Sequence, residues 1–153
     1  MTETKNTAET RKHIAQVGKL LHVIVKELLD RADVHDDSKL GPVEAAMFER
    51  VTHRLATTTY GTPEYAACLE DMKADALPHH YAHNRHHPEH HKNGIEDMTL
   101  IDLVEMLADW KAATMRHNDG DLAKSLEHNE TRFGIPPTLA KILGNTAREL
   151  GWA

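Results

Sequence analysis

Hydrophobic residues recur at helical spacing along most of the chain, and strand-like alternation is absent. The N-terminal part carries one stripe of apolar positions three or four residues apart: Ile14, Val17, Leu21, Ile24 and Leu28. This spacing predicts a long helix over about residues 7–32. His13 lies beside the stripe, so such a helix could turn this imidazole toward the interior.

A second stripe of apolar residues at helical spacing follows Thr99: Leu100, Leu103, Val104, Leu107 and Trp110. Thr99 and Asp102 have the spacing of a capping box, so a helix should begin here. Asp102, Glu105 and Asp109 fall on the face opposite the stripe. We expect Asp102 to serve the cap, whereas Glu105 could either face water or orient a metal-binding imidazole.

Shorter helices are predicted over about residues 42–56, 62–77, 121–133 and 137–150. In the first of these, the residues expected to be buried are Val43, Ala46, Met47 and Val51. Gly134 and Gly151 stand where C-caps belong. Residues 79–97 have no hydrophobic period and contain a proline and a glycine, so we expect a long His-rich loop there. The predicted fold is all-α, a single helical bundle of about five to seven helices over residues 1–153, with about six flexible residues at its start.

Composition narrows the classes of protein that remain. The 153 residues are enough for one domain, and 40% of them are hydrophobic, as in soluble globular proteins. A net charge of −6 argues against a nucleic-acid polymer as partner. Cys68 is the single cysteine, which excludes a disulfide within the chain and a cysteine-based zinc site. No stretch suits a secretory signal or a membrane span, so we expect a cytoplasmic protein without a membrane partner. The sequence is also compatible with a homo-oligomer.

Histidine and aspartate, which bind borderline divalent metals, occur in five separate segments. These candidate ligands are His13, the doublet His35-Asp36, the pair His79-His80, the group His86, His87 and His90, and finally Asp109. One or two divalent ions bound by such residues could activate water for hydrolysis. On composition alone, ordinary surface or core positions explain the same residues equally well. The His-rich segment could also bind metal without any function.

Several short motifs resemble the HD-domain phosphohydrolase superfamily. The order His13, His35-Asp36 and Asp109 is similar to the His…His-Asp…Asp signature of that superfamily, and Ser38-Lys39 is similar to its Gly-Lys. Residues 107–113 resemble the helix that carries the last aspartate. The likeness is strongest to a small His-rich branch found in phages and bacteria, and it covers roughly residues 10–135.

The resemblance implies roles for particular residues. His13, His35, Asp36 and Asp109 would hold a first ion, with Asp36 able to bridge to a second. The second ion would take His79 or His80 together with one further histidine, from the set His86, His87 and His90. The metal could be Fe, Mn, Co, Ni or Zn. Phosphate would be bound by basic residues near these ligands, with Lys39 also acting in catalysis beside Asp36: Lys39, Arg85, Lys111 and Arg116. His117 is a further candidate for a substrate loop.

The expected function is therefore a metal-dependent phosphohydrolase that acts on a small phosphate ester, with a nucleotide as the favoured substrate. A small-molecule substrate suits an acidic chain better than a polymer does. The Gly-Tyr-Pro signature of cyclic-dinucleotide phosphodiesterases is absent, so that substrate has no support. Two alternatives remain open: an HD-type di-iron oxygenase, and a non-catalytic metal-binding protein that acts in phage and host interaction.

Overall fold

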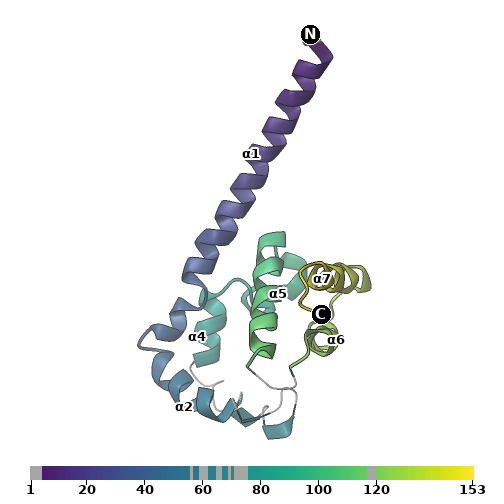
Figure 1. Cartoon of the computed structure of the whole chain (residues 1–153). Helices are drawn as coiled ribbons and strands as arrows, with labels where there is room; N and C mark the ends of the chain where they lie inside the picture. The colour runs from purple at the N-terminus through teal and green to yellow at the C-terminus, as the bar shows by residue number, and fades with distance from the viewer. Residues whose placement is uncertain are drawn as a thin grey trace. The chain divides into compact units, whose positions relative to one another are not determined.

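The computed structural model describes residues 5–55, 57–58, 62–64, 67–68, 70, 76–116 and 120–153 (Figure 1). Every regular element in these residues is helical, which confirms the predicted all-α class. The α-helices are α1 (Lys5–Val34), α2 (Ala45–Leu55), α4 (Ala76–His83), α5 (Leu100–Thr114), α6 (Leu122–Phe133) and α7 (Pro137–Glu149). Three 3₁₀ turns accompany them: η1 (Asp37–Leu40), η2 (Pro88–His90) and η3 (Gly94–Asp97).

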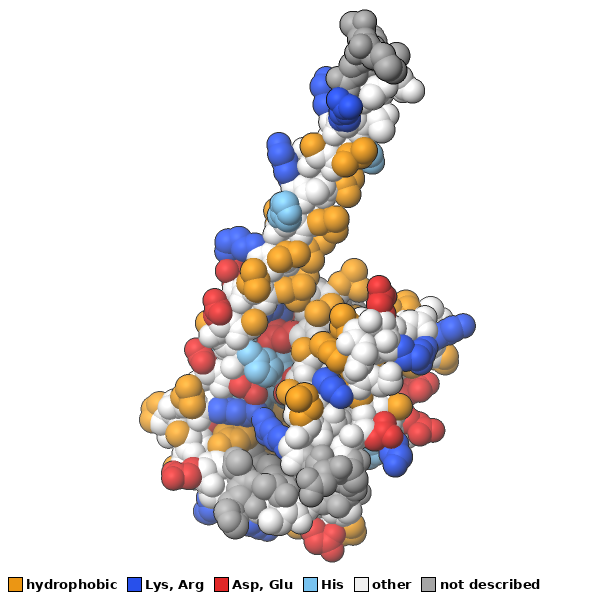
Figure 2. Space-filling view, in the orientation of Figure 1, with side chains coloured by type: hydrophobic (Ala, Val, Ile, Leu, Met, Phe, Trp, Pro, Cys, Tyr) orange, Lys and Arg blue, Asp and Glu red, His pale blue; other side chains and the backbone are white. Residues whose placement is uncertain are grey.

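The chain divides into two compact units, residues 1–35 and residues 36–153. The described part of the first unit is α1 followed by His35. α1 confirms the long helix predicted from the apolar stripe and extends it by a few residues at each end. Figure 2 shows apolar side chains along much of this helix, and most of its large apolar residues are exposed.

The larger core of the second unit forms where α5 packs against α6 and α6 against α7 (Figure 1). Its buried residues are apolar and come mainly from these helices: Ile95, Leu103, Met106, Leu107, Trp110, Leu122, Ile135, Leu143 and Ala147. The predicted capping box begins α5, since the Thr99 hydroxyl accepts a hydrogen bond from the Asp102 backbone N–H at 3.2 Å. Gly134 ends α6 with a φ of 60°, as predicted for a C-cap. Capping residues that can be recognised in the sequence therefore account for the start of α5 and the end of α6.

The smaller core joins α2 and α4, and its composition differs from the prediction. Val51 is fully buried, as expected, and packs with Cys68 and Leu77. Val43 and Ala46 are exposed, and the buried position near the start of α2 is Glu44 instead. A carboxylate in this place needs hydrogen-bonding partners, because burying an unpaired charge is costly. Those partners are histidines, described below.

The prediction of a long loop over residues 79–97 is wrong, because α4, η2 and η3 occupy most of it. Pro78 lies within the first turn of α4, where a missing N–H breaks no helical hydrogen bond. The helix therefore passes through Pro78 and continues to His83. Much of the helix predicted over residues 62–77 lies outside the described residues. Among the described residues, no helix has the length and apolar character needed to cross a membrane.

Candidate metal centre

Four side chains of the second unit converge on one point. Asp36, His80, His86 and His87 each offer one donor atom, and these atoms all lie within 4.8 Å of one another. Asp36 Oδ1 is 3.3 Å from His80 Nε2 and 3.6 Å from His86 Nε2. His80 Nε2 is also 2.8 Å from His87 Nε2. His80 and His86 are buried, while Asp36 and His87 are half-buried, so the group is largely shielded from water.

Asp109 of α5 lies at the same place. Its carboxylate offers an oxygen within 4.8 Å of donor atoms on Asp36 and His86. The sequence prediction that Asp36 and Asp109 come together is therefore confirmed, although they are far apart along the chain. Two carboxylates and three imidazoles now surround one region of the second unit.

The backbone at Asp36 has a rare conformation. Asp36 has φ 60° and ψ 15°, and it is the one residue other than glycine with a positive φ in the described part of the chain. Aspartate and asparagine tolerate this left-handed region better than other non-glycine residues. The turn is closed by a hydrogen bond from the Lys39 N–H to the Asp36 carbonyl at 2.8 Å. The left-handed turn thus directs the chain into η1.

Two carboxylates fix how the buried imidazoles are oriented. His80 Nδ1 is 3.0 Å from Glu44 Oε2, and His86 Nδ1 is 3.1 Å from Glu105 Oε1. An Nδ1–H that donates to a carboxylate leaves a lone pair on Nε2. In both residues this Nε2 is the atom that faces Asp36. The arrangement matches the carboxylate–histidine pairs that orient ligands around metal ions.

Glu44 accepts hydrogen bonds from two histidines, His79 and His80, on the side of the group away from Asp36. Its side chain is fully buried, and its second oxygen, Oε1, accepts a hydrogen bond from His79 Nδ1 at 2.5 Å. Burial alone would raise the pKa of Glu44, but hydrogen bonds from His79, Ser38 and His80 outweigh it and lower that pKa. Glu44 is therefore ionised at neutral pH and holds two imidazoles at once.

Two histidines of the group, His80 and His87, are neutral at pH 7 because their pKa values are lowered. Burial first, and then the neighbouring imidazoles of His86 and His80, lower the pKa of His87 to about 3, against the opposing charges of Asp109 and Asp36. Burial also lowers the pKa of His80. A neutral imidazole is the form that binds a metal ion. The protonation state of these residues is thus already suited to ligation.

The remaining predicted ligands are His13, His35, His79 and His90. His13 is exposed on α1, 22 residues before His35, which is about 33 Å along a continuous helix. A single chain therefore does not bring these two histidines together. His35 closes the N-terminal unit directly before Asp36, and its role as a ligand stays a prediction. His79 contacts Glu44, and His90 Nδ1 contacts the Tyr81 carbonyl at 2.8 Å, so neither belongs to the converging group.

The four predicted phosphate-binding residues have distinct surroundings. Lys39 pairs with Asp36 Oδ2 and lies 4.9 Å from the ring centre of Phe48. The Arg85 guanidinium makes two bonds to Asp102, at 3.3 and 3.2 Å. The Lys111 ammonium donates to the carbonyl of Trp152, and Arg116 is exposed just after α5. Lys39 is therefore the one of the four that contacts a residue of the converging group. His117 lies outside the described residues.

Sequence reasoning missed Glu44 and left Glu105 undecided. Glu44, Phe48 and Val51 are spaced four and three residues apart, so they share one face at the start of α2. A carboxylate on an otherwise apolar helix face was the signal in the sequence that could have indicated a buried, hydrogen-bonded Glu44. Glu105 contacts His86, which favours the orienting role over exposure to water.

One protein family matches almost the whole chain. It is described as "Family of unknown function (DUF5662)", and the match covers residues 2–149. The chain belongs to this family. No curated protein and no solved structure matches the DUF5662 chain significantly. The description of the family names no activity, so a function has to be argued from the residues themselves.

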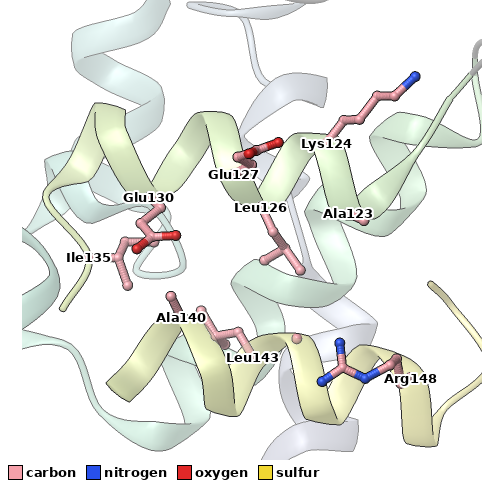
Figure 3. A pocket seen from close by; sticks show the side chains of 10 residues that line it. Ala123, Lys124, Leu126, Glu127, Glu130, Ile135, Ala140, Leu143 and Arg148 are labelled. Atoms are coloured by element: carbon pink, nitrogen blue, oxygen red, sulfur yellow. The ribbon is translucent and has the colours of Figure 1, made fainter. Parts of the chain in front are cut away.

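A separate groove lies between α6 and α7 and has a volume of about 360 Å³ (Figure 3). Figure 3 shows Leu126 and Leu143 in the space between the two helices, while Lys124 points away from it. Among the described residues that line the groove, none belongs to the predicted site. The groove is therefore not part of the candidate metal centre.

Proposed function

We propose that this chain binds a divalent metal ion through Asp36, His80, His86 and His87, with Asp109 beside them, and hydrolyses a small phosphate ester. The observation that carries the proposal is the orientation of two imidazoles. Their Nε2 atoms face one carboxylate, while their Nδ1 atoms are held by Glu44 and Glu105. Buried histidines that only stabilise a core have no need of this common direction.

The donor set fits a first-row transition metal. Imidazole nitrogen and carboxylate oxygen suit Fe, Mn, Co, Ni and Zn, and the absence of thiolate donors matches a catalytic rather than a structural zinc site. Ligands at about 2.0–2.2 Å from one ion lie roughly 3–4.4 Å from one another. The donor atoms, within 4.8 Å of one another, need small side-chain movements to reach that arrangement.

A divalent ion in such a site lowers the pKa of a bound water and polarises a phosphoryl oxygen. The chain's own residues supply the rest of the chemistry. Lys39 contacts Asp36 at the edge of the group, where its ammonium can offset negative charge on a phosphate. Glu44 and Glu105 keep the imidazoles in one tautomer. The likeness of His35-Asp36 and Asp109 to the HD signature supports hydrolysis, and the net charge of −6 favours a small substrate such as a nucleotide.

The test uses protein purified without a histidine tag. Elemental analysis gives the metal content, and a panel of nucleoside monophosphates, triphosphates and cyclic nucleotides gives the release of phosphate or nucleoside. We expect bound metal and turnover, with both lost in Asp36→Asn and both retained in His83→Ala, an exposed histidine outside the group. A chain that binds metal but leaves the whole panel intact contradicts the hydrolase. Oxygen consumption by an iron-loaded sample would then identify the oxygenase instead.

A further inference from the structure

The buried amide of Asn84 connects two segments that supply proposed ligands. Asn84 is 8% exposed, and its Nδ2 donates to the Ser38 hydroxyl at 2.7 Å and to the His80 carbonyl at 2.8 Å. A carbonyl oxygen can only accept, so the amide has to turn its nitrogen, and not its oxygen, toward it. Both N–H groups of this amide are therefore used, and one of them reaches a residue 46 positions away in the chain.

The hydroxyl of Ser38 joins three segments of the second unit. Ser38 lies in η1, and its oxygen accepts the hydrogen bond from Asn84. The same oxygen is 3.2 Å from His80 Nδ1, but that nitrogen already donates its hydrogen to Glu44 and has no lone pair to offer. The hydroxyl therefore donates to the carboxylate of Glu44, directly before α2. One side chain thus ties η1 to α4 and to the start of α2.

The bond between Ser38 and Asn84 lies next to the contact between two proposed ligands. Asp36 comes two residues before Ser38 in the turn that opens η1. His80 comes four residues before Asn84, and the Asn84 backbone N–H donates to the His80 carbonyl at 3.0 Å, so the two share one face of the last turn of α4. Two neighbouring contacts therefore connect η1 with α4.

Of these two contacts, the one between the ligands cannot hold the segments together. Asp36 Oδ1 lies 3.3 Å from His80 Nε2. Because the His80 hydrogen is on Nδ1, a carboxylate oxygen and an imidazole lone pair face each other, and they repel until a cation lies between them. The bond between Ser38 and Asn84 is the attractive contact of the two, so it has to keep the ligands in place.

We propose that Ser38 is a positioning residue of the metal centre and that Asn84 holds it in place. The Ser38 hydroxyl keeps η1 against α4, so that Asp36 and His80 face one ion. This inference rests on the proposed metal centre. Ser38 acts on the ion through Asp36 and Glu44, and Asn84 acts through Ser38.

Metal affinity in a double-mutant cycle tests this pair. The metal-free full-length protein is titrated with zinc and manganese by calorimetry, after circular dichroism has verified the fold. Ser38→Ala and Asn84→Ala should each bind metal about tenfold more weakly, at the lower end of the range for groups that orient ligands. The double variant should also lose about tenfold, because both substitutions remove the same bond. Ser38→Thr keeps the hydroxyl and should bind metal as the wild type does.

A second serine–asparagine pair provides the matched control. In α6, Asn129 Nδ2 donates to Ser125 Oγ at 3.4 Å, and none of the proposed ligands lies in this helix. Ser125→Ala should lower the melting temperature and leave metal affinity unchanged. Unchanged affinity in folded Ser38→Ala, a loss in Ser125→Ala as large as in Ser38→Ala, or a loss of about a hundredfold in the double variant would each overturn the proposal.

Crystal structures of the metal-free protein separate this proposal from the proposed function. In Ser38→Ala, the repulsion between Asp36 Oδ1 and His80 Nε2 is no longer opposed, so their separation of 3.3 Å should increase beyond about 3.6 Å. Asn84→Ala serves as a second variant and should show the same change. An unchanged separation in both variants would overturn the positioning role. A wild type that binds no metal would instead refute the proposed function, and the two crystal structures would still decide whether Ser38 positions Asp36.

Discussion

Replacing Glu44 by glutamine tests whether the outer carboxylates control metal affinity. Glu44 is fully buried and accepts hydrogen bonds from His79 at 2.5 Å and from His80 at 3.0 Å. The amide of Glu44→Gln has one accepting oxygen and one donating nitrogen, so it can accept from one of the two imidazoles. His80 then loses the contact that fixes its Nε2 lone pair toward Asp36, or His79 is displaced.

Loss of such an orienting partner lowers metal affinity by about 10–100-fold, or roughly 1.4–2.7 kcal/mol. The assay is titration calorimetry of the metal-free protein with zinc and manganese, with circular dichroism to verify the fold. Glu49→Gln on the exposed side of α2 is the matched control and should bind as the wild type does. Affinity of Glu44→Gln within twofold of the wild type, in a folded protein, would refute the reasoning.

Further predictions concern single residues. Asp36→Asn should lose bound metal yet melt at a similar temperature, whereas Asp36→Ala should also lose about 1 kcal/mol of stability, because alanine disfavours the left-handed backbone at φ 60°. The pKa of His87, about 3 when folded, lies below its ordinary value of 6.5, so the unfolded chain binds more protons between these values. The metal-free protein should therefore lose stability, on the order of 4 kcal/mol, as pH falls from about 6.5 to 3, and urea titrations of His87→Leu should show a weaker dependence. Asp102→Ala should cost about 2–4 kcal/mol in urea unfolding, because it removes the cap of α5 and leaves Arg85 without its carboxylate. Met106→Ala, at a fully buried position, should cost about 2–5 kcal/mol in the same assay.

Features with local causes were predictable from the sequence. The capping box of Thr99 and Asp102, the ends of α6 at Asp121 and Gly134, and the length of α1 depend on neighbours within a few residues. Such signals are complete in the sequence itself, so the all-α class and most helix ends could be read in advance.

Features that depend on contacts between residues distant in sequence were harder to predict. The sequence predicts a helix that ends at about residue 77 and a loop from residue 79, whereas the first turn of a helix accommodates proline and α4 passes through Pro78. Seven histidines lie close together in this part of the sequence. The helical path of α4 and the contacts with Glu44 and Glu105, which are distant in sequence, decide which of these histidines converge. Spacing along the chain carries no information about those contacts, so His79 and His90 could not be separated from His80 and His86.

The convergence of Asp36 and Asp109 was predicted from the resemblance to HD proteins, and the structure brings the two together. The same resemblance also placed His13 with them, which a continuous α1 does not allow within one chain. The family resemblance thus indicated the right types of residue. The length of α1 separates His13 from His35 within one molecule.

The central claim is that Asp36, His80 and His86 share one ion. Anomalous diffraction from crystals grown with manganese or zinc measures this directly. The account predicts a peak about 2.0–2.2 Å from Asp36 Oδ1 and from Nε2 of both histidines, with Glu44 and Glu105 still bonded to the opposite ring nitrogens. An anomalous peak bound instead to exposed histidines such as His83, with none at Asp36, would contradict it.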